Sequence, residues 1–188
     1  MVVSGFDEES IIEPDPVALV AALARAKAEA VAASLRSLRY ERSSESRRAG
    51  SSTVDDAIVI GCDSVLAFEG EIHGKPADAA EATARWQRLR GGTGVLHTGH
   101  HVIHGSGART AVASTTVRFA DLTDAEIDAY VATGEPVEVA GAFTIDGLGG
   151  AYVTGISGDH HAVVGISLPL LRTMLAELGI PWHTLWHG

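Results

Sequence analysis

The spacing of apolar and polar residues predicts helices and strands that are mixed throughout the chain. Segments with a 3.6-residue period read as helices, and alternating or short continuous apolar runs read as strands. The predicted helices cover residues 16–38, 78–90, 123–133 and 168–178, and the predicted strands cover 1–6, 95–103, 109–119 and 151–156, with a hairpin at 57–75. Because both hairpins and helical crossovers occur, we expect an α/β fold with a mixed central β-sheet flanked by helices.

Residues 39–55 interrupt this pattern. They are polar, rich in Ser and Arg, and aperiodic, which predicts a flexible surface loop. Ser46-Arg47-Arg48 within this loop could also bind phosphate, but a solvated charged insertion is the better interpretation. A chain of 188 residues is long enough for one domain, 1–188, with two lobes around a cleft.

Composition narrows the possible partners and compartment. The net charge of −10 argues against binding to DNA or RNA polymers, although a local cluster of cations would suffice for a nucleotide. The lone cysteine, Cys62, excludes an intramolecular disulfide and fits a reducing compartment. No apolar run approaches the roughly 20 residues that cross a membrane, so we expect a cytoplasmic protein without membrane contact.

One segment, from Ala57 to Pro76, concentrates the candidate chemistry. An apolar run typical of a strand delivers a single carboxylate, Asp63, between small residues. After a Glu-Gly turn, a second short run delivers one cation, Lys75, between a glycine that permits close approach and a proline that stiffens the loop. Burying a lone carboxylate is costly unless it has a charge partner or a metal. The hairpin therefore predicts a phosphate or metal site.

Further short motifs follow one another along nearly the whole chain. They are Asp7-Glu8, Ala26-Lys27-Ala28, Gly61-Cys62-Asp63-Ser64-Val65, Gly74-Lys75-Pro76, His97-Thr98-Gly99, Gly134-Glu135-Pro136, Ala140-Gly141 and Val164-Gly165-Ile166-Ser167-Leu168-Pro169. Each is weak alone, but their joint order and spacing are hard to obtain by chance. In these motifs the chain resembles the Maf family of nucleoside triphosphate pyrophosphatases, which are also called septum-formation-inhibitor-like proteins.

The resemblance implies hydrolysis of pyrimidine or modified nucleoside triphosphates to the monophosphate and pyrophosphate. It implies that Asp63 and Lys75 are catalytic, and it leaves open whether Asp63 is the general base or a metal ligand. Glu8 and Asp63 are hard oxygen ligands, which favour Mg²⁺ or Mn²⁺ over zinc. The substrate-binding residues implied are Lys27, Ser64, Thr98 and Asp146. The family also implies a homodimer.

Two departures from the family pattern bear on this hypothesis. The family's N-terminal Ser-x-Ser-Pro-Arg-Arg loop, which would supply amides, hydroxyls and guanidinium groups to a triphosphate, has no counterpart here. We therefore expect the chain as written to be much less active than one extended upstream by such a loop. In addition, Asp146 stands where many members carry Gln, and a carboxylate only accepts hydrogen bonds, so the base preference does not carry over.

Several alternatives stay open at this stage. The missing loop favours a catalytically weak nucleotide-binding regulator of septum formation, and a related pyrophosphatase for deaminated purines is a third possibility. Glu8 lies in a run of acids that also fits a solvated turn, and Lys27 on a helix would ordinarily face solvent. The nine histidines show no ligand spacing with cysteine or carboxylates, which favours surface histidines over a zinc site.

Overall fold

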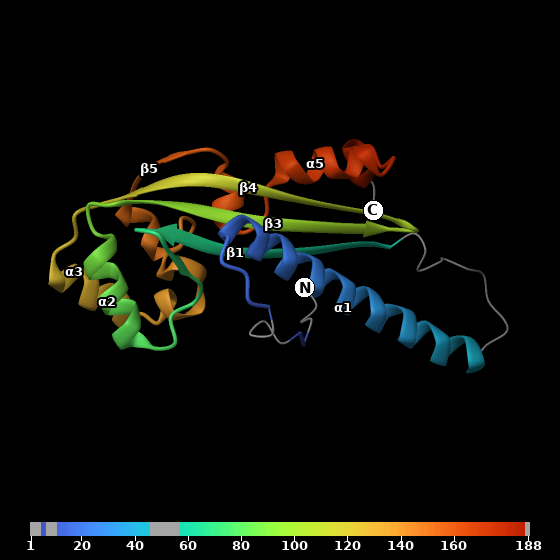
Figure 1. The fold of residues 1–188 in the computed structure, drawn as a ribbon, viewed down its shortest axis with the longest axis horizontal. Coiled ribbons are helices and arrows are strands. Elements are labelled where there is room, and N and C mark those ends of the chain that lie inside the picture. The colour runs from blue at the N-terminus through green and yellow to red at the C-terminus, as the bar shows by residue number, and fades with distance from the viewer. Residues whose placement is uncertain (1–4, 7–10, 46–56, 187–188) are drawn as a thin grey trace.

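The computed structural model describes residues 5–6, 11–45 and 57–186, and for residues 38–45 only the backbone is described. Its centre is a five-stranded sheet in the order β2-β1-β3-β4-β5 (Figure 1). The strands are β1 (Ile58–Phe68), β2 (Glu71–His73), β3 (Thr93–His104), β4 (Gly107–Phe119) and β5 (Val153–Ser157). The predicted α/β class is confirmed.

Every pairing between the described strands is antiparallel, so the expected mixed sheet is not what these strands form. A parallel pair needs a crossover that carries the chain back along the sheet. The helices α2 (Ala79–Leu89) and α3 (Asp124–Ala132) instead sit together at one end of the sheet, and the chain re-enters the sheet from that end (Figure 1).

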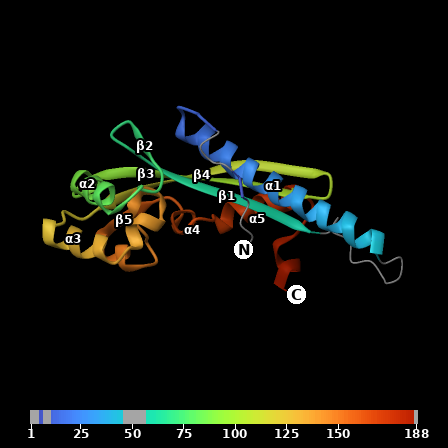
Figure 2. The same ribbon diagram turned by 90° about the horizontal axis from the view of Figure 1, so that it is seen from below.

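Long helix α1 (Pro16–Glu45) covers one face of the sheet, and the other helices lie on the opposite face (Figure 2). Asp15 caps α1 by accepting a hydrogen bond from the Ala18 amide at 3.0 Å, and Pro16 occupies the first helical position. In the part of the chain that the structure describes, no helix combines the length and apolarity that crossing a bilayer requires.

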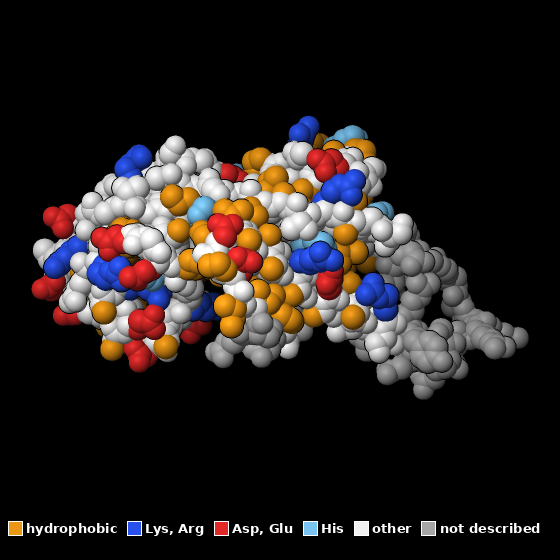
Figure 3. Space-filling model, in the orientation of Figure 1, with side chains coloured by type: hydrophobic (Ala, Val, Ile, Leu, Met, Phe, Trp, Pro, Cys, Tyr) orange, Lys and Arg blue, Asp and Glu red, His pale blue; other side chains and the backbone are white. Residues whose placement is uncertain are grey.

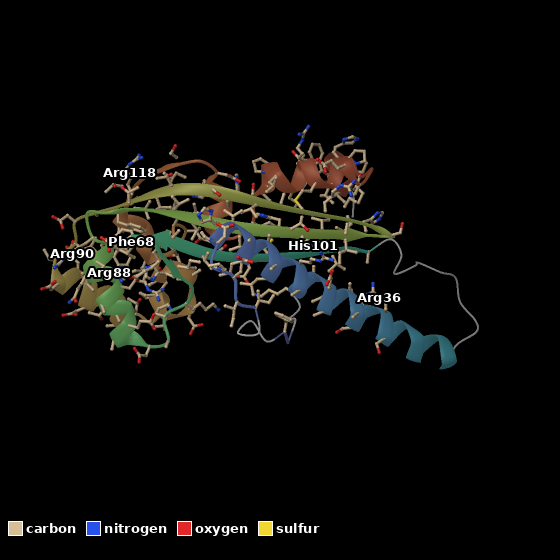
Figure 4. The ribbon with its side chains drawn as sticks, in the orientation of Figure 1. Arg36, Phe68, Arg88, Arg90, His101 and Arg118 are labelled. Atoms are coloured by element: carbon tan, nitrogen blue, oxygen red, sulfur yellow. The ribbon has the colours of Figure 1, made fainter. Side chains whose placement is uncertain are left out.

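Two apolar clusters fill the opposite face. The larger lies between the sheet and α2 and α3, where the ring of fully buried Trp86 makes edge contacts with Phe119, Tyr130 and Tyr152 at centroid distances of 5.6, 5.5 and 5.9 Å. The smaller consists of Val102 packed against Leu171, Met174 and Leu175 of α5 (Leu168–Glu177). Figure 4 shows Arg88 and Arg90 at the α2 end, away from Arg36 and His101.

The predicted hairpin forms because two residues at its tip adopt positive φ. Glu69 has φ 51° and Gly70 has φ 81°, the backbone that a tight two-residue turn requires. Arg88 of α2 then contacts both sides of the tip, binding Glu69 at 3.0 Å and Glu71 at 2.8 Å. The hairpin is therefore tied to α2, and Gly74 and Lys75 follow directly after β2.

Most predicted elements are confirmed within one or two residues, with four differences. Helix α1 continues to Glu45, so residues 39–45, which were predicted as loop, are helical. No Gly or Pro lies between Pro16 and Gly50 to end the helix, and the Arg and Glu residues of this stretch favour helix. The predicted strand at 151–156 begins at Val153, after a 3₁₀ turn. The short helix α4 (His160–Val164) was not predicted. The predicted first strand is wrong at residues 5–6, which are not strand, because Gly5 has a positive φ of 63°. Residues 1–4 and 46–56, which carry the rest of that strand and of the predicted loop, lie outside the described residues.

Two glycines let α1 lie directly on the sheet. A β-carbon built on Gly61 of β1 would lie 2.2 Å from the Ala24 carbonyl oxygen, and one on Gly99 of β3 would lie 2.1 Å from the Val20 carbonyl oxygen. Contacts this short are impossible for any larger residue, so both positions mark a close approach of helix backbone to strand. Lys27 follows Ala24 on α1 by about one helical turn.

Candidate active site

A cleft of about 770 Å³ lies along the edge of β1. Strand β2 pairs only with the end of β1, from Leu66 to Phe68, so within the described chain the stretch that carries Asp63 has no partner strand on that side. The cleft wraps around this edge and is lined by residues from both faces of the sheet. Its size is that of an ordinary small-molecule site. Its walls are α1, the turn after β2, and the segments around residues 138–146 and 163–165.

Asp63 and Lys27 form an ion pair inside the cleft. Asp63 points from β1 toward α1, and its carboxylate Oδ2 contacts the Lys27 Nζ; their side chains are 11% and 23% exposed. Asp63 lies two residues after Gly61, on the same face of the strand, which is why the close helix contact delivers Lys27 to it. An adjacent cation keeps a carboxylate ionised, and a partly buried pair is screened less by solvent than a surface pair.

Lys75 lines the same cleft from the turn after β2, but it is exposed. The turn is fixed through the Gly74 carbonyl oxygen, which accepts hydrogen bonds from Arg85 Nη1 at 2.6 Å and from the Gly141 amide at 3.0 Å. The hairpin thus brings Asp63 and Lys75 to one cleft, as predicted. The charge partner of Asp63 among these lysines is nevertheless Lys27, because the hairpin places Lys75 at the edge while α1 crosses over the carboxylate.

Ser64 lines the cleft, whereas Thr98 is fully buried beneath it. The Thr98 hydroxyl donates to the Ala162 carbonyl at 2.8 Å, and the Ser64 and Thr98 hydroxyl oxygens are 2.9 Å apart. A hydroxyl carries one hydrogen, so Thr98 accepts from Ser64 and the Ser64 oxygen has only lone pairs left for a ligand. Thr98 was predicted to line the cleft. It instead lies behind the wall and positions Ser64.

Asp146 is exposed at the rim of the cleft, in a loop that also supplies Thr144 to the wall. Behind this loop lies Glu135, whose carboxylate accepts hydrogen bonds from Thr144 Oγ1 and from the Gly149 amide at 2.5 and 2.9 Å. In the sequence, Glu135 stands out only as part of the Gly134-Glu135-Pro136 motif. Its signal is a glutamate placed before a glycine-dense segment, where unpaired amides need an acceptor.

Cys62 also lines the cleft, next to Asp63. Burial, reinforced by the nearby Asp63 charge and opposed by Lys27, raises the pKa of the Cys62 thiol to about 11. A thiol with this pKa stays protonated at neutral pH and is a poor nucleophile. Half-buried Cys62 therefore contributes a neutral side chain to the cleft wall.

The histidines of β3 are more buried than predicted. His100 is fully buried: its Nε2 accepts from the Ser167 amide at 2.8 Å and its Nδ1 lies 3.0 Å from the Thr98 carbonyl oxygen, which makes it a neutral structural histidine. Burial lowers its pKa. Across the described residues, no three His, Cys, Asp or Glu side chains gather closely enough to hold a metal ion.

Of the two predicted metal ligands, Glu8 lies outside the described residues. Asp63 is a hard oxygen donor inside the cleft, and further carboxylates at Glu13, Glu138 and Asp146 line its walls. This donor chemistry fits Mg²⁺ or Mn²⁺, which take oxygen ligands and complete their shells with water and phosphate oxygens. It does not fit a soft-metal site, because the described lining of the cleft offers one thiol and no histidine.

The cleft therefore combines an ionised carboxylate, one partly buried lysine and one exposed lysine around a strand edge. Such an arrangement can neutralise a chain of phosphates and hold a water molecule beside them. Of the predicted residues, the structure brings together Lys27, Asp63, Ser64, Lys75 and Asp146. Thr98 lies behind the wall of the cleft, and Glu8 lies outside the described residues.

Comparison with known proteins gives consistent results. The sequence model of the family described as Maf-like protein matches residues 1–178. The chain is 52% identical to a protein of Salinispora tropica over 188 residues, which cover 99% of this chain and 77% of that protein. It is 50% identical to a protein of Streptomyces avermitilis, covering 99% and 83%, and 50% identical to one of Cutibacterium acnes, covering 100% and 84%. All three relatives are named nucleoside triphosphate pyrophosphatase.

Proposed function

Because the chain belongs to the Maf-like family, we propose that it hydrolyses nucleoside triphosphates between the α and β phosphates. The products are a nucleoside monophosphate and pyrophosphate. The observation that carries the proposal is the Lys27–Asp63 ion pair in a cleft that Lys75 also lines. The printed name of the relatives, nucleoside triphosphate pyrophosphatase, supports the same reaction.

The residues of this cleft account for each requirement of the reaction. The water oxygen bonds to the α-phosphorus, the bond from that phosphorus to the bridging oxygen breaks, and pyrophosphate leaves with the bond's electron pair. Asp63 orients the water and takes its proton. Lys75, on an exposed flexible side chain at the rim, binds the β and γ phosphates and offsets the charge of the leaving group. Lys27 contacts Asp63 Oδ2 and favours the ionised form of the carboxylate, which is the form that accepts this proton.

We include a divalent cation, Mg²⁺ or Mn²⁺, in this proposal. Asp63 would hold it on this chain, with Glu8 as the second ligand that the resemblance implies. When bound, the cation supplies additional positive charge to the phosphate oxygens.

For the base, we propose pyrimidine or modified nucleotides. The resemblance suggests this class, and Asp146 at the rim adds a chemical constraint. A carboxylate only accepts hydrogen bonds, so it favours a base edge that presents N–H groups. Uracil and thymine present such a group at the ring nitrogen and cytosine at its amino group. Adenine and guanine also present N–H groups, so the choice of pyrimidines rests on the resemblance and Asp146 constrains only which edge of the base faces it.

We also propose that the chain forms a homodimer. Apolar side chains gather in the middle of the face drawn in Figure 3, next to the charged end formed by α2 and α3. Ile12 is 93% exposed and Val17 is 39% exposed. Exposed apolar patches of this kind are typical of association surfaces. Light scattering at micromolar concentration measures the mass directly.

The activity is tested by pyrophosphate release from UTP, CTP, dTTP, ATP and ITP with Mg²⁺ or Mn²⁺. We expect release by the wild-type chain and a loss of about 10²–10⁴-fold in kcat for Asp63→Asn, because the amide cannot take the proton. Asp128→Asn, an exposed carboxylate on α3, is the matched control and should leave release unchanged. Tight nucleotide binding without release would overturn the enzyme and favour a nucleotide-binding regulator. A preference for ITP would contradict the proposed pyrimidine substrates.

A further inference from the structure

A single carboxylate gathers the loop that forms one wall of the cleft. Glu135, at the start of a short 3₁₀ turn after α3, accepts four hydrogen bonds. Its Oε1 accepts from Tyr130 Oη at 2.7 Å, Thr144 Oγ1 at 2.5 Å and the Gly149 amide at 2.9 Å, and its Oε2 accepts from the Leu148 amide at 2.9 Å. Three of these four donors belong to residues 144–149.

The loop is also shaped to fit closely around this carboxylate. A β-carbon on Gly147 would lie 2.5 Å from Thr144 Oγ1 and 2.6 Å from Glu135 Oε2. A β-carbon on Gly149 would lie 2.3 Å from Tyr130 Oη and 2.8 Å from the Thr144 carbonyl oxygen. Neither glycine has a positive φ, so close approach, and not backbone conformation, is what requires them.

The hydrogen bonds hold Glu135 in its ionised form. Desolvation raises its pKa, but the bonds from Thr144, Tyr130, Gly149 and Leu148 outweigh this and lower the pKa to about 2. The partner hydroxyl responds in the opposite direction, because burial and the Glu135 charge raise the pKa of Tyr130. Both groups keep their hydrogen-bonding roles throughout the neutral range.

Residues 144–149 reach the cleft at two points. Thr144 and Asp146 both line it. In the chain, Asp146 stands between two residues that bind Glu135: Thr144 through its hydroxyl and Leu148 through its backbone amide. Glu135 itself is not among the residues that line the cleft. It therefore acts on a bound molecule only through the loop.

From this arrangement we infer that Glu135 is a positioning residue that holds Asp146 at the rim of the cleft and thereby sets how tightly the nucleobase is bound. The inference rests on the proposed function for the identity of the ligand. It separates two tasks: the Lys27–Asp63 side performs the chemistry, and the loop held by Glu135 selects the base. Loosening the loop should weaken binding and base discrimination while the hydrolytic step continues.

Glu135→Gln is the direct test, because the amide keeps the volume but turns donor hydrogens toward the loop amides. We expect KM for UTP and CTP to rise about tenfold or more, the equivalent of one lost charge-assisted hydrogen bond, with kcat changed less than about threefold. The ratio of kcat/KM between the preferred and the poorest base should fall toward one. An equal loss of kcat and kcat/KM for every base would overturn the inference.

Gly147→Ala approaches the same contact from the other side. Its added carbon pushes the loop away from Glu135, so its KM effect should match that of Glu135→Gln, and the double variant should be less than additive. Glu126→Ala is the control for stability alone: it removes the side chain that closes the capping box of α3 with Thr123, away from the cleft lining, and should lower the melting temperature with KM unchanged. A KM effect in this control equal to that of Glu135→Gln would contradict a positioning role.

A readout without turnover keeps the two proposals distinct. Amide hydrogen exchange at Leu148 and Gly149 should accelerate about tenfold or more in Glu135→Gln, while exchange in β3 stays unchanged. The Kd of the non-hydrolysable α,β-methylene analogue of UTP should rise in parallel. If the wild type releases no pyrophosphate but these changes occur, the proposed hydrolysis fails and the positioning role stands. If release is normal and Glu135→Gln leaves exchange, Kd and KM unchanged, the positioning role fails.

Discussion

The two walls of the cleft are held in place by different physical means. On one side, α1 lies against β1 and β3 through backbone contacts that only Gly61 and Gly99 permit. On the other, residues 144–149 pair with no strand of the described chain and are held by hydrogen bonds to the Glu135 side chain. The first wall is defined by steric contact between regular elements, and the second by a set of donors around one charge.

This difference matches what each wall would do. Steric contact between a helix and a sheet leaves little freedom, which suits a carboxylate and a lysine that must meet a reacting phosphate within a fraction of an ångström. Hydrogen bonds to an irregular loop can change with a few substitutions while the rest of the fold stays intact. Under the proposed function, the chemistry would lie on the rigid wall and the choice of base on the adjustable one.

The largest expected effect comes from removing the support beneath the loop wall. Trp86 is fully buried, and its Nε1 donates to the Ala142 carbonyl at 2.7 Å, just before the loop. Trp86→Ala should lower the free energy of unfolding by about 3–5 kcal/mol, because it leaves a large cavity and an unpaired carbonyl. Urea unfolding followed by circular dichroism measures this. Trp186→Ala, which truncates a Trp that is 69% exposed, should change it by less than about 0.5 kcal/mol.

A smaller loss of stability with a larger loss of activity is expected on the rigid wall. Gly61→Ala forces a carbon against the Ala24 carbonyl oxygen, which is backbone and cannot rotate away. We expect about 1–3 kcal/mol of destabilisation and roughly a 10²-fold fall in kcat, because α1 and Lys27 move away from Asp63. Ile60→Ala on the neighbouring position of β1 loses apolar contact without touching α1. A Gly61→Ala protein with wild-type kcat would show that the close helix contact does not position the pair.

The smallest expected effect is the dependence of stability on acid. The folded-state pKa of Glu135 is lowered to about 2 from an ordinary value of 4.5, so its stabilisation is complete above pH 4.5 and is lost as the pH falls toward about 2. The difference in unfolding free energy between wild type and Glu135→Gln should therefore be constant above pH 5 and shrink between pH 4.5 and about 2. Urea titrations at several pH values measure it. A difference that does not change over this range would be inconsistent with the ionised network.

Much of the fold could be predicted because local signals agree with the final structure. The capping box at Thr123 and Glu126, the Asp15-Pro16 start of α1 and the Glu-Gly hairpin turn are all present in the structure. These features depend on neighbouring residues, whose interactions are visible in the sequence. The end of α1 was wrong because polar residues can continue a helix when no Gly or Pro stops them.

Most of the predicted site residues line the cleft, but the ion pair between Lys27 and Asp63 was not predicted. Asp63 and Lys75 share a hairpin, which made their association apparent, whereas Lys27 reaches Asp63 only through the packing of α1 on the sheet. Two glycines inside strands were the available signal for that packing. Thr98 is buried because its face of β3 packs against α4. Glu135 meets its hydrogen-bond donors because the glycine-dense loop folds back onto it. Neither depends on neighbouring residues.

The direction of the hydrogen bonds behind Ser64 has a consequence for how a nucleotide can lie in the cleft. Thr98 spends its one hydrogen on Ala162, so the Ser64 oxygen faces outward as an electron-pair donor alone. A phosphate oxygen placed against it would meet lone pair with lone pair, whereas a sugar hydroxyl or an ordered water has a hydrogen to give. Under the proposed function, buried Thr98 would thus direct the triphosphate away from Ser64 and leave that place to the sugar or to a water molecule.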